Sequence, residues 1–474
     1  NNFSIAGTGC SPVTAETSVV NQLGAIRFQN NTLSGSLTLT AAARIGAASG
    51  VTGTLNGALA GGFPLTINST DNSNHTGVIT LNASAYTNTI TVARGGLKLG
   101  SSSNPAGNLT VADGAALYAN NIAGDGTAPS IGGTLTLGTA TGATFHFDPT
   151  AAAHAQAGSV SLAGTNPLGL TAPAPVGTTT VLGATGGITG TGTMVLGGSA
   201  NYRAGTAVTV GANSITLTVD SSNLSWTGTT DGAWDFTTAN WDTSTFHHLD
   251  NVSFTDAATT TAVTIGSGIS VFPNSITASN SAKNYTISGA GGVSSTGALT
   301  KRGTGTLTLN NTTANSFASI SLDEGTLSLG NFGAGGTGKL SLNGGSLFLS
   351  TATGNPLEFN MPATVTVGSQ QTMTGNWSGT QEVTVNGTSN HLWSLSGTWT
   401  NFTGSIKMGT GHVSIRLNGG SSNSMFGSPN VAVDLGSGSS WFMNRNGGTM
   451  EIGSLASTGT STVLSGPQSG TTAT

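Results

Sequence analysis

The chain has 474 residues, of which 73 are glycine and only 6% are charged. An ordinary soluble domain carries about 25% charged residues, so this composition is unusual. The 12 basic and 17 acidic residues give a net charge of −5. This balance argues against nucleic acid and against an anionic membrane surface as partners, because both require clustered Lys and Arg. No apolar run approaches the roughly 18 residues of a membrane helix.

Cys10 is the single cysteine, which excludes an internal disulfide bond. We interpret it as a small buried hydrophobic residue, with an intermolecular bridge as the alternative. The first residues lack the basic and apolar segments of a signal peptide, so we expect a mature chain.

Short alternating strands begin near the start of the chain and become regular in residues 61–140. The pairs Ile79/Leu81, Leu97/Leu99, Leu117/Ala119 and Leu135/Leu137 follow one another at nearly equal steps. A second set of pairs, Ile90/Val92 and Leu109/Val111, lies between them. Alternation with period two indicates half-buried strands, and a fixed longer period indicates a solenoid.

Two stretches interrupt this array. Residues 151–157 are rich in alanine, and we expect a turn or a single helical loop there. Residues 164–177 contain three prolines, Pro167, Pro173 and Pro175. Because proline cannot donate to a strand ladder, we expect a loop in this segment.

Residues 224–256 differ from the rest of the chain in composition, because they are rich in tryptophan and aspartate. The candidate ligand or lateral-contact residues are Trp226, Trp234, Trp241, Asp250 and Asp256. Exposed indole faces stack on sugars, and carboxylates bind hydroxyl groups or calcium. The alternative is an aromatic mini-core at a joint, with aspartates serving turns. We do not interpret the pair His247-His248 as a metal motif, because neighbouring side chains on a strand point to opposite faces.

The strongest repeat runs from Leu299 to Leu349, where strand pairs recur about every 20 residues, a period typical of solenoids. We predict the inward columns Leu307, Leu309, Ile320, Leu322, Leu327, Leu329, Leu340, Leu342, Leu347 and Leu349. The charged pairs Lys301-Arg302 and Asp323-Glu324 are expected at solvated corners and turns.

This region resembles the autotransporter-associated β-strand repeat of large bacterial surface proteins. The resemblance rests on Leu299-Thr-Lys301, Gly303-Thr-Gly-Thr-Leu-Thr-Leu-Asn310 and Asp323-Glu-Gly-Thr-Leu-Ser-Leu-Gly330, with upstream pieces at Trp226–Gly228, Trp234, Asn240–Trp241, Asp250–Phe254 and Tyr285–Gly289. It implies a secreted, cell-surface β-helix with a structural or adhesive role.

We therefore expect an all-β fold, a parallel β-helix or β-solenoid with turns of about 20 residues and a Trp-rich insert in the middle. The expected division is a solenoid segment over 1–223, the insert over 224–262 and a second solenoid segment over 263–474.

Three functions remain to be compared. The first is a structural extracellular protein that assembles with copies of itself into a cell-surface fibre, sheath or layer, through terminal strands or lateral Thr/Ser faces. The second is an adhesin that binds surface polysaccharide. The third, a polysaccharide-degrading enzyme, needs a face of clustered charges that we do not expect 29 scattered charged residues to form (12 basic plus 17 acidic). We expect no catalytic centre, no metal and no cofactor.

Overall fold

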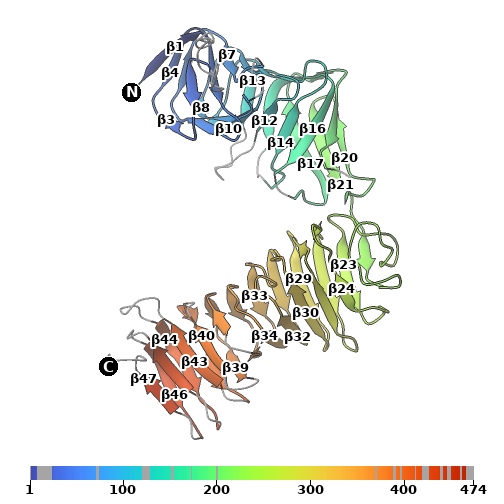
Figure 1. The fold of residues 1–474 in the computed structure, drawn as a ribbon, viewed down its shortest axis with the longest axis vertical. Coiled ribbons are helices and arrows are strands. Elements are labelled where there is room, and N and C mark those ends of the chain that lie inside the picture. The colour runs from blue at the N-terminus through green and yellow to red at the C-terminus, as the bar shows by residue number, and fades with distance from the viewer. Residues whose placement is uncertain are drawn as a thin grey trace. The chain divides into compact units, whose positions relative to one another are not determined.

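A computed structural model describes the chain except residues 1, 8–23, 71–73, 120–128, 151–153, 172, 199–200, 369–370, 388–390, 396–397, 411–412, 419–425, 438–440, 446–449, 460–461 and 466–474. Cys10 thus lies outside the described part. The regular elements of the described residues are all β-strands, and nearly all strand pairs are parallel. The predicted all-β solenoid is therefore confirmed (Figure 1). No helix long and apolar enough to cross a membrane occurs in the described part.

The chain divides into two compact units, Asn1–Asp220 and Ser221–Thr474. The described residues of unit 1 form two sheets. Sheet 1 contains β1 (Phe3–Gly7), β2 (Ile26–Phe28), β4 (Leu37–Ala47), β6 (Leu59–Gly61), β7 (Leu65–Ile67), β9 (Ile90–Val92), β11 (Leu109–Val111), β13 (Ser130–Leu137), β15 (Ala155–Leu162), β17 (Gly177–Ala184), β18 (Ile188–Gly190), β20 (Ala207–Val210) and β21 (Ser214–Val219). Sheet 2 contains β3 (Thr32–Leu33), β5 (Thr52–Leu55), β8 (Val78–Ser84), β10 (Gly96–Ser103), β12 (Ala116–Tyr118), β14 (Thr144–Phe147), β16 (Thr165–Leu170) and β19 (Thr193–Leu196).

Unit 2 forms four sheets in its described residues. Sheet 3 contains β22 (Asn223–Ser225), β23 (Asn251–Thr255), β26 (Ser275–Ser279), β29 (Ala298–Arg302), β31 (Ser319–Leu322), β33 (Lys339–Leu342), β35 (Leu357–Phe359), β38 (Trp377–Gly379) and β41 (Asn401–Phe402). Sheet 4 contains β24 (Ala262–Thr264), β27 (Tyr285–Gly289), β30 (Thr306–Asn311), β32 (Thr326–Leu329), β34 (Ser346–Leu349), β36 (Ala363–Val367), β39 (Glu382–Gly387), β42 (Ser405–Met408), β44 (Phe426–Asp434) and β46 (Met450–Ala456). The smaller sheets are sheet 5, with β25 (Ser270–Val271) and β28 (Gly292–Val293), and sheet 6, with β37 (Gln371–Met373), β40 (His391–Leu395), β43 (Val413–Asn418), β45 (Trp441–Arg445) and β47 (Thr462–Ser465).

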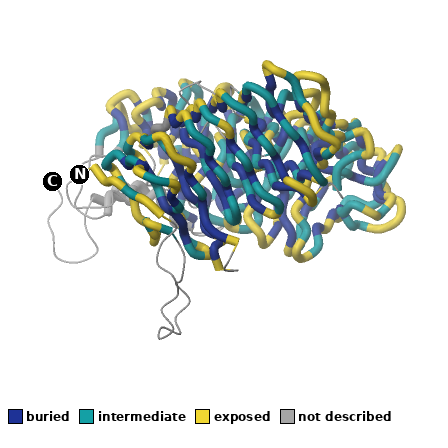
Figure 2. The backbone as a smooth tube through the Cα atoms, turned by 90° about the horizontal axis from the view of Figure 1, so that it is seen from above, coloured by how far each residue is buried: buried dark blue, intermediate teal, exposed yellow. Residues whose placement is uncertain are grey.

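The core follows from the alternation of apolar and polar residues along each strand. Leu307 pairs with Leu327 and Leu327 with Leu347, so each inward side chain lies on the equivalent leucine of the next turn. All ten predicted inward residues are at most 1% exposed, which confirms the predicted repeat. Figure 2 shows this alternation of buried and partly exposed positions along the strands. Burying a leucine side chain contributes about 1.5–3 kcal/mol, so the columns account for much of the stability.

The register of unit 1 differs from the expected one at Leu135. This leucine pairs with Leu109, in sheet 1, and not with Leu117 of sheet 2. Leu117 instead pairs with Phe145, which lies further along the chain. The apparent repeat step from Leu117 to Leu135 therefore linked two different sheets.

Parts of two expected irregular segments are strands, whereas Pro173 and Pro175 lie outside strands as expected, and residues 151–153 and 172 are outside the described part. Residues 155–162 form β15, whose Ala155 and Ala157 point into the core, and not the helical loop expected from their alanine content. Residues 165–170 form β16, in which Asn166 and Leu168 are buried. Pro167 is tolerated there at a half-buried position between these inward residues.

Buried asparagines hold one corner of the solenoid in both units. Asn68 has a φ of 60°, and its amide donates to the carbonyl oxygens of Gly77 and Arg94 at 2.9 and 2.8 Å. Asn280 donates in the same manner to Lys283 and Thr306. A Cβ atom at Gly305 would lie 2.6 Å from the Asn280 amide nitrogen, so this contact requires glycine at position 305.

Unit 1 closes with a change of strand direction. β21 pairs antiparallel with β17, and β20 pairs antiparallel with β21. The parallel stacking of sheet 1 therefore ends in an antiparallel pair before residue 220, where the second unit follows.

Candidate functional site

The Trp- and Asp-rich residues 226–256, here called the aromatic cap, lie at the start of unit 2. β22 directly precedes this segment and β23 lies at its end, and the two strands pair in parallel. Isolated bridges join Trp226 to Trp241 and Ala233 to Thr264. The segment is therefore a long excursion that returns to complete the first turn of sheet 3.

The three tryptophans of the aromatic cap face inward. Trp226 and Trp234 are 0% exposed and Trp241 is 5% exposed. Ring centroids lie 5.0 Å apart for Trp226 and Trp241 and 5.5 Å apart for Trp234 and Trp241, in edge-to-face arrangements that aromatic rings favour. Phe246 and Phe254 complete the cluster. In this arrangement the indole faces contact aromatic neighbours and present no open platform for a sugar.

The aspartates of the cap bind backbone groups. Asp250 is fully buried, and its two carboxylate oxygens accept N–H groups from Ser222 and His247, both at 2.8 Å. Asp256 accepts the N–H groups of Ser281, Ala282 and Lys283 in the next turn. These bonds, with that of Ser281 first, hold the pKa of Asp256 below its usual value. Both candidate carboxylates thus fix loops.

His247 and His248 lie in a turn and not on a strand, so the reason given for excluding a metal motif does not apply. The His247 ring nitrogen Nδ1 lies 3.1 Å from the Thr245 carbonyl oxygen, whereas the His248 ring is buried among phenylalanines. Among the described residues, no three His, Cys, Asp or Glu side chains gather closely enough to hold a metal ion.

A second cluster of functional groups lies on the outer face of sheet 3, where sequence periodicity did not predict it. We call it the polar ladder and define it as Arg302, Ser321, Asp323, Lys339, Ser341, Asn343, Glu358 and Asn360. Its members come from consecutive turns of unit 2, at or next to the ends of β29, β31, β33 and β35. The expectation that no face gathers charged residues is therefore wrong for this surface.

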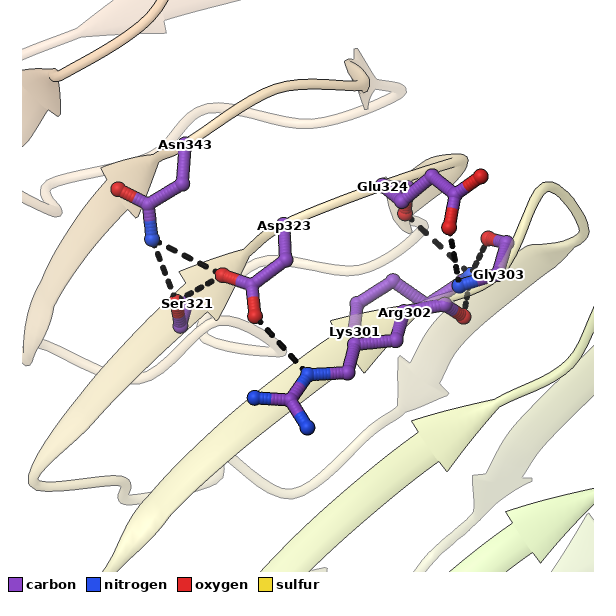
Figure 3. Close-up of polar contacts among 7 residues, drawn as sticks. All are labelled: Lys301, Arg302, Gly303, Ser321, Asp323, Glu324 and Asn343. Carbon is purple, nitrogen blue, oxygen red and sulfur yellow. Dashed lines mark hydrogen bonds and ion pairs between the residues drawn. The ribbon is translucent and has the colours of Figure 1, made fainter.

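The contacts of the polar ladder run from turn to turn (Figure 3). Arg302 Nε donates to Asp323 Oδ2 at 3.1 Å, and Asn343 Nδ2 donates to Asp323 Oδ1 at 2.9 Å. Asn360 Nδ2 donates to Asn343 Oδ1 at 2.9 Å. Lys339 Nζ donates to Glu358 Oε2 at 2.8 Å. The ladder thus links four turns through side chains alone.

The pKa values of the two ladder carboxylates, Asp323 and Glu358, are lowered, which favours their ionised forms. Burial raises the pKa of Asp323, but hydrogen bonds from Asn343, Ser321 and Arg302 outweigh it and hold the pKa below its usual value. The hydrogen bond from Lys339, followed by that from Ser341, lowers the pKa of Glu358. Neither carboxylate has the raised pKa of a general acid that works at neutral pH.

Lys301, next to the ladder, is fully buried, so the expectation of a solvated corner is wrong for this residue. Its Nζ donates to the carbonyl oxygens of Arg302 at 2.6 Å, Gly303 at 2.5 Å and Glu324 at 3.4 Å. Burial lowers its pKa to about 8, against the opposing attraction of Glu324 and Asp256. Three donors meet three acceptors, so this ammonium group is structural.

Glu324 and Asp323 also differ from a simple solvated turn. The Glu324 carboxylate accepts the backbone N–H of Gly303 in the preceding turn at 3.1 Å, and Figure 3 shows it beside Lys301 and Gly303. A signal for the ladder exists in the sequence, because Asp323 and Asn343 occupy equivalent positions of successive turns. Arg302 and Asp323 are 21 residues apart, whereas Asp323 and Asn343 are 20 apart, so a constant period of 20 does not align Arg302 with Asp323.

No family model, no curated protein and no solved structure matches this chain.

Proposed function

We propose that the protein is a structural β-solenoid of the cell exterior whose copies assemble side by side. One observation carries this proposal, a file of outward hydroxyl groups on sheet 1. Its members are in register on consecutive turns and comprise Thr66, Thr91, Thr110, Thr136, Ser161 and Thr189. This file carries no charge itself, with Arg44 of the preceding turn in register with Thr66 at one end, so its hydroxyl groups offer no electrostatic repulsion to a second copy.

The use of polar groups within the frame supports a structural role. Asn68, Asn166 and Asn280 hold corners, Lys301 binds carbonyl groups, and Asp256 binds a loop. Each of these side chains bonds backbone in a neighbouring turn. Their chemistry is therefore directed at rigidity and not at a bound substrate.

Light scattering and electron microscopy of the purified protein at physiological salt test assembly directly. We expect polymers or lateral aggregates whose formation is blocked by Thr110→Lys together with Thr136→Lys, because two ammonium groups would then lie within the uncharged file. Thr54→Lys, at an outward position of β5 in sheet 2, is the matched control and leaves assembly intact. A wild-type protein that stays monomeric at high concentration contradicts the proposal.

Location outside the cell is part of the same proposal. It is supported by the resemblance of the residues around Leu299–Gly330 to surface-protein repeats. Labelling of intact source cells with an antibody against the chain tests it. A signal that appears only after the cells are opened contradicts this location.

The second candidate function is adhesion to polysaccharide, and the polar ladder favours it. The Arg302 and Lys339 side chains are 62% and 51% exposed and lie among amide and carboxylate groups that can bind sugar hydroxyls. Glycan-array binding that is lost in Arg302→Ala with Lys339→Ala, and retained in the exposed control Lys407→Ala on β42, would support adhesion. Equal binding by both variants would contradict it.

A further inference from the structure

The turn His247–Asp250 attaches the aromatic cap to the next turn of unit 2 through a single residue. His248 Nδ1 accepts the N–H of Phe272 at 3.3 Å, and the N–H of Leu249 donates to the carbonyl oxygen of Phe272 at 2.6 Å. Both backbone groups of Phe272, its N–H and its carbonyl oxygen, are thus hydrogen-bonded to this turn. Because Nδ1 accepts, the imidazole is neutral and carries its proton on Nε2.

The His248 ring also forms part of the aromatic packing. It is 8% exposed, and its centroid lies 4.6 Å from that of Phe272, 4.7 Å from Phe236 and 6.5 Å from Phe246. Phe246 in turn contacts Trp234 at 5.5 Å. A displacement of the imidazole therefore disturbs the packing of Phe246, which in turn contacts the tryptophan cluster at Trp234.

We propose that His248 is an acid-operated release for the aromatic cap. Protonation converts Nδ1 from an acceptor into a donor that faces the N–H of Phe272, so the bond is replaced by repulsion between two donors. A charged ring is also costly to keep in a buried site, so protonation favours its movement toward solvent. Its outward movement breaks the contacts with Phe236 and Phe246 and loosens the Trp cluster.

Backbone strain beside the imidazole assists this release. Leu249 has a φ of 70°, in the left-handed region that is unfavourable for a residue with a bulky side chain. The bond from its N–H to Phe272 helps to hold this conformation. When the hydrogen bonds to Phe272 are lost, Leu249 can leave this unfavourable backbone conformation. The strain therefore favours the state in which the cap is detached from Phe272.

The titratable groups on the elements packed against the imidazole are His247, Asp250 and Asp235. On the same turn, His247 precedes the ring and Asp250 follows it, with the Asp250 oxygens bound to Ser222 and His247. On the segment that carries Phe236, the Asp235 carboxylate is bound to Thr237 and Thr238. On the segment of Phe272, the neighbouring Ser270, Val271 and Pro273 do not titrate.

Burial, and after it the charge of His247, lowers the pKa of His248 to about 4. The pKa of histidine in an unfolded chain is about 6.5. The unfolded or open state therefore binds a proton that the closed cap does not hold between these two values. Closure is fully favourable above about pH 6.5 and weakens as the pH falls toward about 4.

Hydrogen exchange measured by mass spectrometry between pH 7 and pH 4, corrected for intrinsic rates, tests this release in the full chain. Peptides of residues 226–256 report on the cap, and peptides of residues 299–349 serve as an internal reference. We expect the protection of the cap to fall progressively as the pH is lowered from about 6.5 to 4, while the reference stays protected. In His248→Asn, whose side-chain oxygen can replace Nδ1 as acceptor, this pH dependence disappears, and in His247→Asn it persists.

A cap that keeps its protection throughout this range overturns the proposal, as does a His248→Asn variant with the wild-type pH profile. If that variant does not fold, selective imidazole labelling and NMR of the wild-type protein decide the matter. One imidazole with a depressed pKa must then titrate together with the opening of the cap. Imidazoles that all titrate near the ordinary histidine pKa, without any change in the cap, overturn the proposal as well.

Discussion

The carboxylate of Asp113 binds Thr139 of the next turn through both oxygens: Oδ1 accepts the backbone N–H and Oδ2 accepts the hydroxyl, each at 2.8 Å. Oδ1 also accepts the N–H groups of Ala140, Thr141 and Gly142. Asp256 binds residues 281–283 of unit 2 in the same way. Each unit thus has a corner loop that is closed around an aspartate from the preceding turn.

Replacing this anion should loosen unit 1. We expect Asp113→Asn to lower the melting temperature and to increase hydrogen exchange in residues 139–142, because an amide brings two N–H donors into a loop of donors. Asp148→Asn is the matched control, since Asp148 also binds a threonine N–H and hydroxyl, but within its own loop at Thr150. Similar losses in both variants would mean that the link between turns contributes nothing special.

The same carboxylate predicts an acid limit of stability. The N–H groups of Thr139, Ala140 and Gly142 hold the pKa of Asp113 well below its usual value. The unfolded chain therefore takes up a proton before the folded chain does, and the stabilisation is complete above about pH 4 and declines below it. Thermal melts from pH 7 to pH 2 should show this decline, and it should be smaller in Asp113→Asn. A variant with the wild-type acid profile would contradict the assignment.

Lys301 should be more important for stability than its exposed neighbour. We expect Lys301→Met to cost about 1–3 kcal/mol, because it leaves the carbonyl oxygens of Arg302, Gly303 and Glu324 buried without this donor. Arg302→Met removes only a partly exposed ion pair with Asp323 and should cost about 0–1 kcal/mol. Urea denaturation of both variants measures the difference, and equal losses would show that the buried ammonium is dispensable.

The inward column around Leu327 offers a test of packing. Leu327→Ala should cost about 2–5 kcal/mol, since the side chain is fully buried between Leu307 and Leu347 and the cavity cannot collapse easily. Phe332→Ala is the control, because Phe332 is 75% exposed and should change the free energy of unfolding by less than about 0.5 kcal/mol. A comparable loss at Phe332 would indicate that this side chain is covered in solution.

The repeat of unit 2 could be predicted because its turns keep one length. Leu307, Leu327 and Leu347 are in register at equal steps, and alternation fixes which residues face inward. Lys301 escaped prediction, although it occupies the same inward phase as Leu299. Charge suggested solvent, whereas the carbonyl groups of a tight corner provide a buried site for an ammonium group.

Unit 1 could be predicted less completely, because its turns vary in length. The step from Leu109 to Leu135 in sheet 1 is longer than the step from Ile90 to Leu109, so a constant period places Leu135 in the wrong sheet. The antiparallel pairing of β21 with β17 also lies outside a repeat. At the candidate site, Trp226, Trp234 and Trp241 lie outside the regular strands, so the burial of their rings depends on tertiary packing.

The last prediction concerns unit 2 as an independent folding unit. Its first strand, β22, already pairs with β23, and Ser222 is bound to the buried carboxylate of Asp250. The contacts of Trp226, Trp234 and Trp241 are likewise made within residues 221–474. A fragment of residues 221–474 should therefore fold alone, with the near-ultraviolet dichroism of packed tryptophans and a cooperative melt.

A fragment that begins at residue 257 lacks the aromatic cap and leaves Phe272 and Tyr285 without their aromatic neighbours. It should melt at a lower temperature and bind a hydrophobic dye. If both fragments melt alike, the cap contributes little to folding, and if the longer fragment is unfolded, unit 2 depends on residues before Ser221.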